Sequence, residues 1–218
     1  QTVINLDANL AGIEAELGLR TGALQANRAQ RVHVQQQAAR VSQAYQRYVA
    51  CHYWLGQLYQ RFMAGQALLP PAMGLGEQQF SRLSEAFGGP VPVAGEVLRR
   101  QLLVSELLQS RYQERDDLAT WLSGYLAAPF AELSLILATA SMGFKHLWED
   151  LGLDSRAQLR NLMLDCFPQL VALNQHDMRW KKFFYRQLCE QAGSYVCRAP
   201  SCDVCPERAL CFTTDEPA

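Results

Sequence analysis

The stretch VQQQAARVSQAYQRYVACHYWLGQLYQRF, residues 34–62, carries the pattern that decides the fold. Its apolar and aromatic side chains recur at alternating steps of four and three residues, which is the spacing of a heptad repeat on a continuous helix. The pattern predicts a long helix that packs against the rest of the chain or pairs with a second copy of itself. It also makes His52 a packing residue rather than a metal ligand. The repeating positions are Val34, Ala38, Val41, Tyr45, Tyr48, His52, Leu55, Tyr59 and Phe62.

Helical signals extend on both sides of this stretch. Asp7 is a plausible N-cap of a short first helix that Gly18 ends, and the long helix is expected from Thr21 to Gly65. Turn-forming breaks follow at LPPAMGLG (residues 69–76) and GGPVPVAG (residues 88–95), with room for one short helix between them.

The second half of the chain has the same helical period. We expect a helix from Glu96 toward Tyr125 with a kink at the charged residues 114–117, and a helix from Pro129 to Gly143. Ser155 and Gln158 form a capping box, and strand-like alternation is absent from the pattern. Three further signals are Pro168 as a helix start, Asp177 as the cap of the last helix and Gly193 as its end. The sequence predicts an all-α helical bundle, with an N-terminal helical extension (1–47) and a helical domain (48–218) that ends in an irregular cysteine loop (197–211).

Composition limits the classes of function. Of the 218 residues 49% are hydrophobic and 19% charged, with a net charge of −1, which is typical of a soluble globular protein. Without a basic field or a long apolar run, we expect no nucleic-acid partner and no membrane span. The first residues, QTVINLDANL, lack the features of a secretory signal, so we expect a cytoplasmic protein.

Four of the seven cysteines fall within fifteen residues near the carboxyl end, in YVCRAPSCDVCPERALCF (residues 195–212). Cys197, Cys202, Cys205 and Cys211 are separated by four, two and five residues. A gap of two residues lets neighbouring thiolates reach one small site, and four converging thiolates require a metal.

The identity of that metal stays open between two readings. Structural zinc prefers four thiolates, but its sites usually pair two tight cysteine knuckles. One tight pair between two loose single cysteines suits the larger span of an iron–sulfur cluster, so the spacing favours the cluster. Disulfides do not suit a reducing cytoplasm, and the other thiols (Cys51, Cys166 and Cys189) sit in apolar helical patterns where we expect buried side chains.

The last helix, MRWKKFFYRQLCEQAG from Met178, is amphipathic. Arg179, Lys182 and Arg186 are three and four residues apart, so they share one face of the helix. An ordinary solvated face is the simpler interpretation. Because the stripe leads into a group of anionic thiolates, an oxyanion site beside the cluster is the sharper hypothesis.

These stretches together resemble the nitrogen-fixation NifQ family. The resemblance rests on MGFKHLWEDLGL (residues 142–153), on FPQLVALN and MRWKKFFYRQLCE (within residues 167–190), and on the four, two and five spacing of the cysteines. A four-cysteine loop on an all-α body also occurs in DNA glycosylases of the endonuclease III class. Their first gap is longer and their helix-hairpin-helix is missing here.

The resemblance implies a molybdenum–iron–sulfur protein that supplies molybdenum for the iron–molybdenum cofactor of nitrogenase. It makes Cys197, Cys202, Cys205 and Cys211 the ligands of a 3Fe–4S or 4Fe–4S cluster convertible to Mo–3Fe–4S. Expected partners are molybdate and the cofactor assembly proteins, a scaffold and a reductase.

Several expectations lie beside this function. We add His146 to Arg179, Lys182 and Arg186 on the molybdate side, because it stands in a polar segment beside two carboxylates. A homo-oligomer through residues 34–62 is expected if the heptad pattern pairs. We find no catalytic motif and therefore expect a cluster donor rather than a turnover enzyme; a small iron–sulfur redox protein and a structural zinc module are the alternatives.

Overall fold

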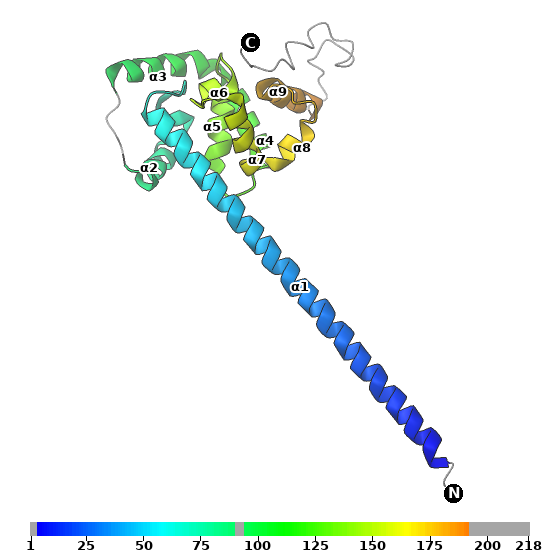
Figure 1. Ribbon diagram of the computed structural model, residues 1–218. Helices are drawn as coiled ribbons and strands as arrows, with labels where there is room; N and C mark the ends of the chain where they lie inside the picture. The colour runs from blue at the N-terminus through cyan, green and yellow to red at the C-terminus, as the bar shows by residue number, and fades with distance from the viewer. Residues whose placement is uncertain (1–3, 90–93, 192–218) are drawn as a thin grey trace. The chain divides into compact units, whose positions relative to one another are not determined.

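The computed structural model describes residues 4–89 and 94–191, and every regular element in those ranges is a helix (Figure 1). This confirms the all-α prediction for the described part, whereas the cysteine loop 197–211 lies outside the described residues. None of the described helices combines the length and the apolar character that a membrane crossing requires. The chain divides into two compact units, Gln1–Gln46 and Arg47–Ala218. The elements are α1 (Ile4–Met63), η1 (Pro71–Gly74), α2 (Glu77–Ala86), α3 (Gly95–Leu108), η2 (Gln109–Arg111), α4 (Tyr112–Ser123), α5 (Ala131–Ser141), α6 (Leu147–Asp150), α7 (Arg156–Cys166), α8 (Pro168–Leu173) and α9 (Trp180–Gln191).

Helix α1 is continuous over 60 residues, so the predicted stop at Gly18 and the new start at Thr21 were wrong. A glycine in the interior of an exposed helix costs only about 1 kcal/mol, which does not end a helix whose neighbours favour it. The hydroxyl of Thr21 donates to the carbonyl oxygen of Leu17 at 2.8 Å, so it bonds within the helix instead of capping it.

Burial along α1 changes at the boundary between the units. All side chains from residue 12 to residue 46 are exposed. From Cys51 onward one face is buried with a helical period and joins the core of the second unit. His52 is exposed, but its ring lies 4.9 Å from that of Phe87, which agrees with a packing role. The buried residues of this face are Cys51, Trp54, Leu55, Leu58, Tyr59 and Phe62.

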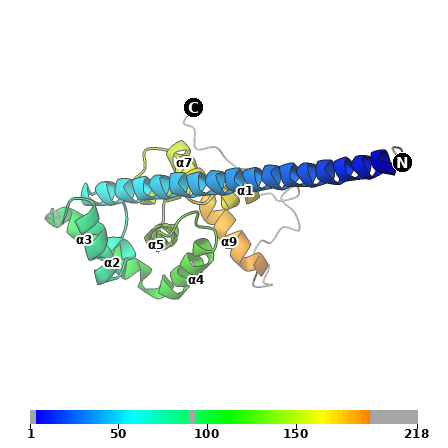
Figure 2. The ribbon, with the colours of Figure 1, turned by 90° about the horizontal axis from the view of Figure 1, so that it is seen from below.

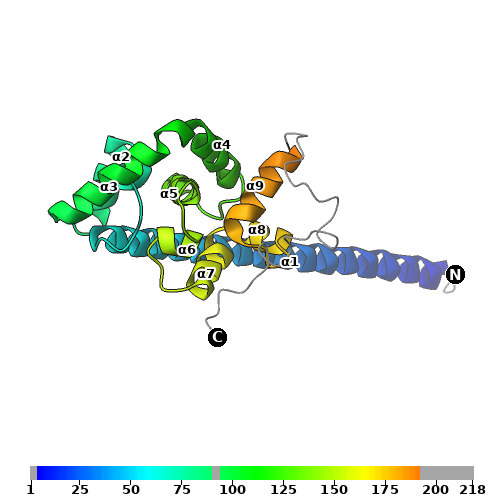
Figure 3. The same cartoon turned by 90° about the horizontal axis from the view of Figure 1, so that it is seen from above.

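The second unit is built around α5, which lies among the other helices in Figures 2 and 3. Eight of its eleven residues are buried, because its sequence AELSLILATAS is apolar or small on all sides. A helix of this kind is stable only inside a core. Ser134, Thr139 and Ser141 are buried with it, and the last two satisfy their hydroxyls by donating to carbonyl oxygens four residues earlier.

Several predicted boundaries are confirmed. A short helix, α2, lies between the two predicted breaks, and α8 starts at Pro168. Ser155 caps α7 by accepting from the Gln158 backbone at 3.2 Å, while the Gln158 side chain accepts from the Asp154 backbone at 2.8 Å.

Two predicted features were misplaced. The break before α4 falls at Gln109–Arg111 rather than at residues 114–117, because acidic residues such as Glu114 are favourable in the first turn of a helix and mark its start. Asp177 does not cap the last helix, which begins at Trp180. It has a positive φ of 49°, and its carboxylate lies 3.6 Å from both Arg156 and Arg160. The predicted end at Gly193 lies outside the described residues.

Candidate functional site

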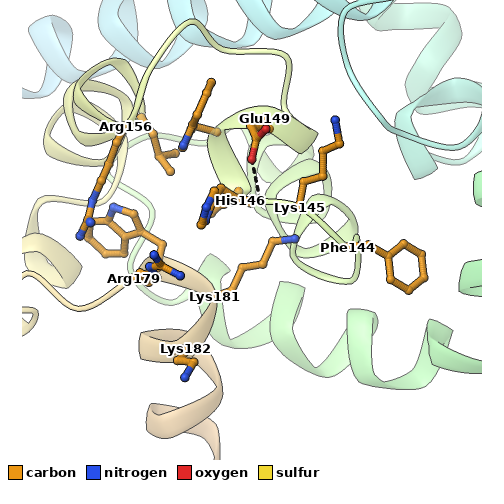
Figure 4. A pocket seen from close by; sticks show the side chains of 12 residues that line it. Phe144, Lys145, His146, Glu149, Arg156, Arg179, Lys181 and Lys182 are labelled. Atoms are coloured by element: carbon orange, nitrogen blue, oxygen red, sulfur yellow. Dashed lines mark hydrogen bonds between the residues drawn. The ribbon is translucent and has the colours of Figure 1, made fainter. Parts of the chain in front are cut away.

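A pocket of about 340 Å³ opens within the second unit where three segments meet (Figure 4). One segment is the turn after α5 together with α6, and the others are the first turns of α7 and α9. These segments are far apart in the sequence, so the pocket exists only in the folded chain. Its walls are Phe144, Lys145, His146, Leu147, Trp148, Glu149, Arg156, Leu159, Arg179, Trp180, Lys181 and Lys182.

The walls are strongly cationic. Five of the twelve lining residues are lysine or arginine, His146 is a sixth titratable nitrogen base, and Glu149 is the single carboxylate among them. A concave surface with charge of one sign concentrates the field and attracts counter-ions. The chain as a whole has a net charge of −1, so this excess of positive charge is local.

The α6 wall is fixed by its own backbone. His146 is the residue before α6, and its backbone N–H donates to the Glu149 carboxylate at 3.1 Å, drawn as a dashed line in Figure 4. The carbonyl oxygen of His146 accepts from the Asp150 backbone at 3.0 Å. One carboxylate oxygen of Glu149 therefore accepts a hydrogen bond at the start of α6, and the start of a helix is a favourable place for a negative charge.

A buried ion pair joins α6 to α9 beneath the pocket. Lys181 Nζ lies 2.5 Å from Asp150 Oδ2 and donates to the carbonyl oxygen of Gly143 at 2.9 Å. The side chains of Asp150 and Lys181 are only 2% and 17% exposed. Burial raises the pKa of Asp150, an effect that the attraction to Lys181 opposes, and burial lowers the pKa of Lys181.

Gly143 is required beside this pair. A Cβ atom at Gly143 would lie 2.6 Å from Asp150 Oδ2, so a side chain there would displace the carboxylate. The close approach of the Gly143 backbone thus lets the pair form at the base of the pocket.

The first turn of α9 is placed by polar and aromatic contacts. The side chain of Asn174 accepts from the Met178 backbone N–H and donates to the Met178 carbonyl, both at 2.8 Å. The Trp180 ring packs 5.8 Å from Phe184, and both residues are buried. Trp180 belongs to both the core and the pocket wall, and Arg179 and Lys182, three residues apart, line the pocket beside it.

A second polar contact holds the middle of α9. Arg111 donates to the hydroxyl of Tyr185 at 2.5 Å and to the carbonyl of Met142 at 2.7 Å. Arg111 also pairs with Glu114 at 2.8 Å, which lowers the pKa of that carboxylate. The turn after α5 and helix α9 are therefore held together at two points, through Lys181 and, one helical turn further along α9, through Tyr185.

The structure brings together three of the four non-cysteine residues proposed from the sequence. His146, Arg179 and Lys182 all line the pocket. Arg186 does not line it; one turn further along α9, its guanidinium pairs with Glu190 at 2.8 Å. The sequence reasoning missed Lys145, Arg156 and Lys181, although the first and last stand beside residues that it had selected.

The cysteines of the predicted cluster lie outside the described residues. Within residues 4–89 and 94–191, no group of three or more His, Cys, Asp or Glu side chains is arranged to hold a metal ion. Cys51 and Cys166 are buried and Cys189 is half-buried. The thiols of Cys51 on α1 and Cys166 on α7 interact, and this interaction and burial raise the pKa of Cys166.

The class defined by these features is an all-helical protein, over its described residues, with a cationic pocket and a cysteine-rich segment after it. Comparison with known proteins names the family. The family description NifQ matches residues 54–213, and the chain belongs to the NifQ family, which takes part in nitrogen fixation.

Curated relatives support this assignment. The NifQ protein of Klebsiella pneumoniae is 48% identical over 161 residues, which cover 73% of this chain and 96% of the relative. The NifQ protein of Azotobacter vinelandii is 39% identical over 172 residues, covering 75% of this chain and 88% of the relative. That of Rhodobacter capsulatus is 48% identical over 103 residues, covering 47% and 57%. No solved structure matches the chain.

Proposed function

We propose that this protein carries a molybdenum–iron–sulfur cluster and supplies its molybdenum for the iron–molybdenum cofactor of nitrogenase. The observation that carries the proposal is the four, two and five spacing of Cys197, Cys202, Cys205 and Cys211 in a chain of the NifQ family. Four thiolates in one short segment can supply the ligands of a cuboidal cluster. A carrier must also release the metal that it holds. Release is easier when the ligands lie on one short segment than when they are spread through a packed core.

The cationic pocket suits the arrival of molybdenum as molybdate. Molybdate is a doubly charged oxyanion, and the thiolates that await the metal are themselves anionic. Arg179 and Lys182 line one wall of the pocket, and Arg156 lines another. Arginine can donate two parallel hydrogen bonds to an oxyanion, whereas lysine supplies a compact charge.

The pocket is attached to the segment that leads to the cysteines. Arg179 and Lys182 are at the start of α9, and Cys197 follows the end of that helix by six residues. The fully extended reach of six residues is about 20 Å, so the first cysteine of the segment is tethered within that distance of the carboxyl end of α9. In this proposal the pocket binds and orients the oxyanion, and the cysteine segment holds the cluster that receives the metal.

Metal analysis of protein purified without oxygen tests the cargo. The expected result is iron and sulfide, with molybdenum bound after loading with molybdate. Zinc without iron would overturn the proposal in favour of a structural zinc module. Iron that never takes up molybdenum would instead indicate an iron–sulfur redox protein.

Substitutions in the pocket test the route of entry. We expect Arg179→Gln with Lys182→Gln to leave the iron content unchanged and to lower molybdenum uptake about tenfold or more, since each charged hydrogen bond contributes about 1.5–3 kcal/mol. Arg186→Gln is the matched control, because Arg186 is on the same helix and does not line the pocket.

Two results distinguish the role of the cluster cysteines from the role of the pocket. Cys202→Ser or Cys205→Ser should lose iron as well as molybdenum, because this pair is expected to anchor neighbouring corners of the cluster. If the double variant of Arg179 and Lys182 takes up molybdenum as the parent does, the pocket is not the entry site of molybdate. The proposed role of His146 in binding molybdate there is then wrong as well.

A further inference from the structure

Residues 12–46 of the first unit are helical, and their side chains have nothing to pack against in the described chain. Every side chain from residue 12 to residue 46 is exposed. Short isolated helices are marginal in water, and most of the stability of helices in proteins comes from packing one apolar face. We therefore expect the helical segment of 35 exposed residues to be stabilised by packing against a partner.

The exposed apolar side chains of this helix form one stripe. Between residues 12 and 50 there are ten large exposed apolar side chains, and seven of them continue the heptad steps of the sequence back to Ile13. The other three, Leu19, Val32 and Val49, lie off the stripe. The seven are Ile13, Leu17, Leu24, Val34, Val41, Tyr45 and Tyr48, and the intervening stripe positions hold Arg20, Asn27, Arg31 and Ala38.

The polar positions of the stripe decide how two copies can pair. In a parallel pair in register, Arg20 would face Arg20 of the other copy and Arg31 would face Arg31. Two buried layers of like charge would oppose that arrangement. An antiparallel pair places different residues opposite each other, so it can avoid both layers.

We infer that two copies of this chain pair through residues 13–45 as an antiparallel coiled coil with a two-fold axis between Asn27 and Arg31. In this register Leu17 faces Val41 and Leu24 faces Val34 of the other copy. A shift of one heptad in one direction places Arg20 against Arg31, and a shift in the other direction places Arg31 against Val34. The facing pairs are Ile13 with Tyr45, Leu17 with Val41, Arg20 with Ala38, Leu24 with Val34, and Asn27 with Arg31.

The charge distribution along the helix supports the same direction. Residues 7–16 contain Asp7, Glu14 and Glu16 and no basic residue, whereas residues 20–47 contain five arginines and no acidic residue. Antiparallel pairing brings the acidic end of each helix beside the basic stretch around Arg40 and Arg47 of the other. The interface is self-complementary, as a closed two-fold dimer requires.

Sedimentation equilibrium of the full chain tests the pairing. We expect the mass of two chains, and we expect Leu24→Asn with Val34→Asn to raise the dissociation constant about a hundredfold or more, because it removes four apolar side chains from the centre of the dimer. The matched control is Leu19→Asn with Val32→Asn, which removes the same two kinds of exposed side chain off the stripe. A monomeric parent, or a control that dissociates as readily, would overturn the inference.

Disulfide mapping tests the direction. The variants Leu24→Cys and Val34→Cys are mixed, oxidised gently and digested, and the linked peptides are identified by mass spectrometry. A link from position 24 to position 34 is expected, and a dominant link from 24 to 24 would overturn the antiparallel register. This inference does not depend on the proposed function, because neither experiment requires a cluster or molybdenum.

Discussion

Asp150 is a buried carboxylate whose charge depends on one amine. Because burial raises its pKa, the folded protein holds the Asp150 proton to higher pH than the unfolded chain does. The contribution of Asp150 to stability is therefore present below the ordinary pKa of aspartate and is lost as the pH rises through the raised value. Asp154 behaves oppositely: its hydrogen bonds to Arg61 lower its pKa, so its contribution is lost as the pH falls through that lowered value.

This contrast gives a pH prediction. The free energy of unfolding of the parent, relative to Asp150→Asn, should fall as the pH rises from about 4 upward. Relative to Asp154→Asn, it should fall as the pH decreases below about 4, which makes Asp154 the matched control. Urea unfolding followed by far-ultraviolet circular dichroism at several pH values measures both slopes. Equal slopes for the two variants would contradict the burial argument for Asp150.

At the scale of single helices, α1 contains three glycines that no neighbour requires, Gly12, Gly18 and Gly22, of which the last two lie in the middle of the exposed segment. An added Cβ at Gly18 or Gly22 meets no atom within 4 Å. In the proposed coiled coil both positions also lie off the apolar stripe. They cost helical stability without a compensating contact.

We therefore expect Gly18→Ala with Gly22→Ala to stabilise α1 by about 1 kcal/mol per site and to raise the temperature at which its helical signal melts. Gly152→Ala is the control with the opposite sign. Its φ is +72° and its Cβ would lie 2.8 Å from the Ala67 backbone, so it should destabilise the second unit. Thermal melting by circular dichroism measures both changes, and no stabilisation by the alanine pair would indicate a contact at Gly18 or Gly22.

Local signals in the sequence predicted helices well where the chemistry is local. The capping box of Ser155 and the helix start at Pro168 depend on a few adjacent residues, and both were confirmed. Gly18 and Asp177 were misread because their outcome depends on wider context. Gly18 stays helical because the residues on both sides of it favour the helix. The carboxylate of Asp177 pairs with Arg156 and Arg160 of another helix instead of capping α9.

At the scale of the whole molecule, the core belongs to the second unit. All buried apolar residues of the described chain lie between Cys51 and Phe184. A chain starting at Arg47 should therefore fold alone and keep its unfolding midpoint within about 5 °C of the full chain. Because it lacks the proposed coiled coil, this chain should also be monomeric.

Two measurements check this expectation. Scanning calorimetry compares the midpoints of the chains 47–218 and 1–218, and sedimentation compares their masses. A shortened chain that unfolds well below this range would mean that residues 1–46 contribute to the core. A shortened chain that remains dimeric would place a second interface in the 47–218 unit.

The site required the folded chain. Heptad and helix periods could place Arg179 and Lys182 on one face, but His146 is more than thirty residues away, and its distance from them depends on how α6 packs beside α9. Arg156 carried no signal at all, because it looks like any first-turn residue of an exposed helix. Lys145 and Lys181 carried a weak sequence signal, since they belong to the cation-bearing stretches FKH and MRWKK.

The walls of the pocket also give the protein an optical reporter. Trp148 and Trp180 both line it, and the buried indole N–H of Trp148 has no hydrogen-bond partner among the described groups. The other two tryptophans, Trp54 and Trp121, are not part of the lining. Anion binding beside two indoles changes their local field, so two of the four tryptophans of this chain are placed to report an occupant through intrinsic fluorescence, without any attached dye.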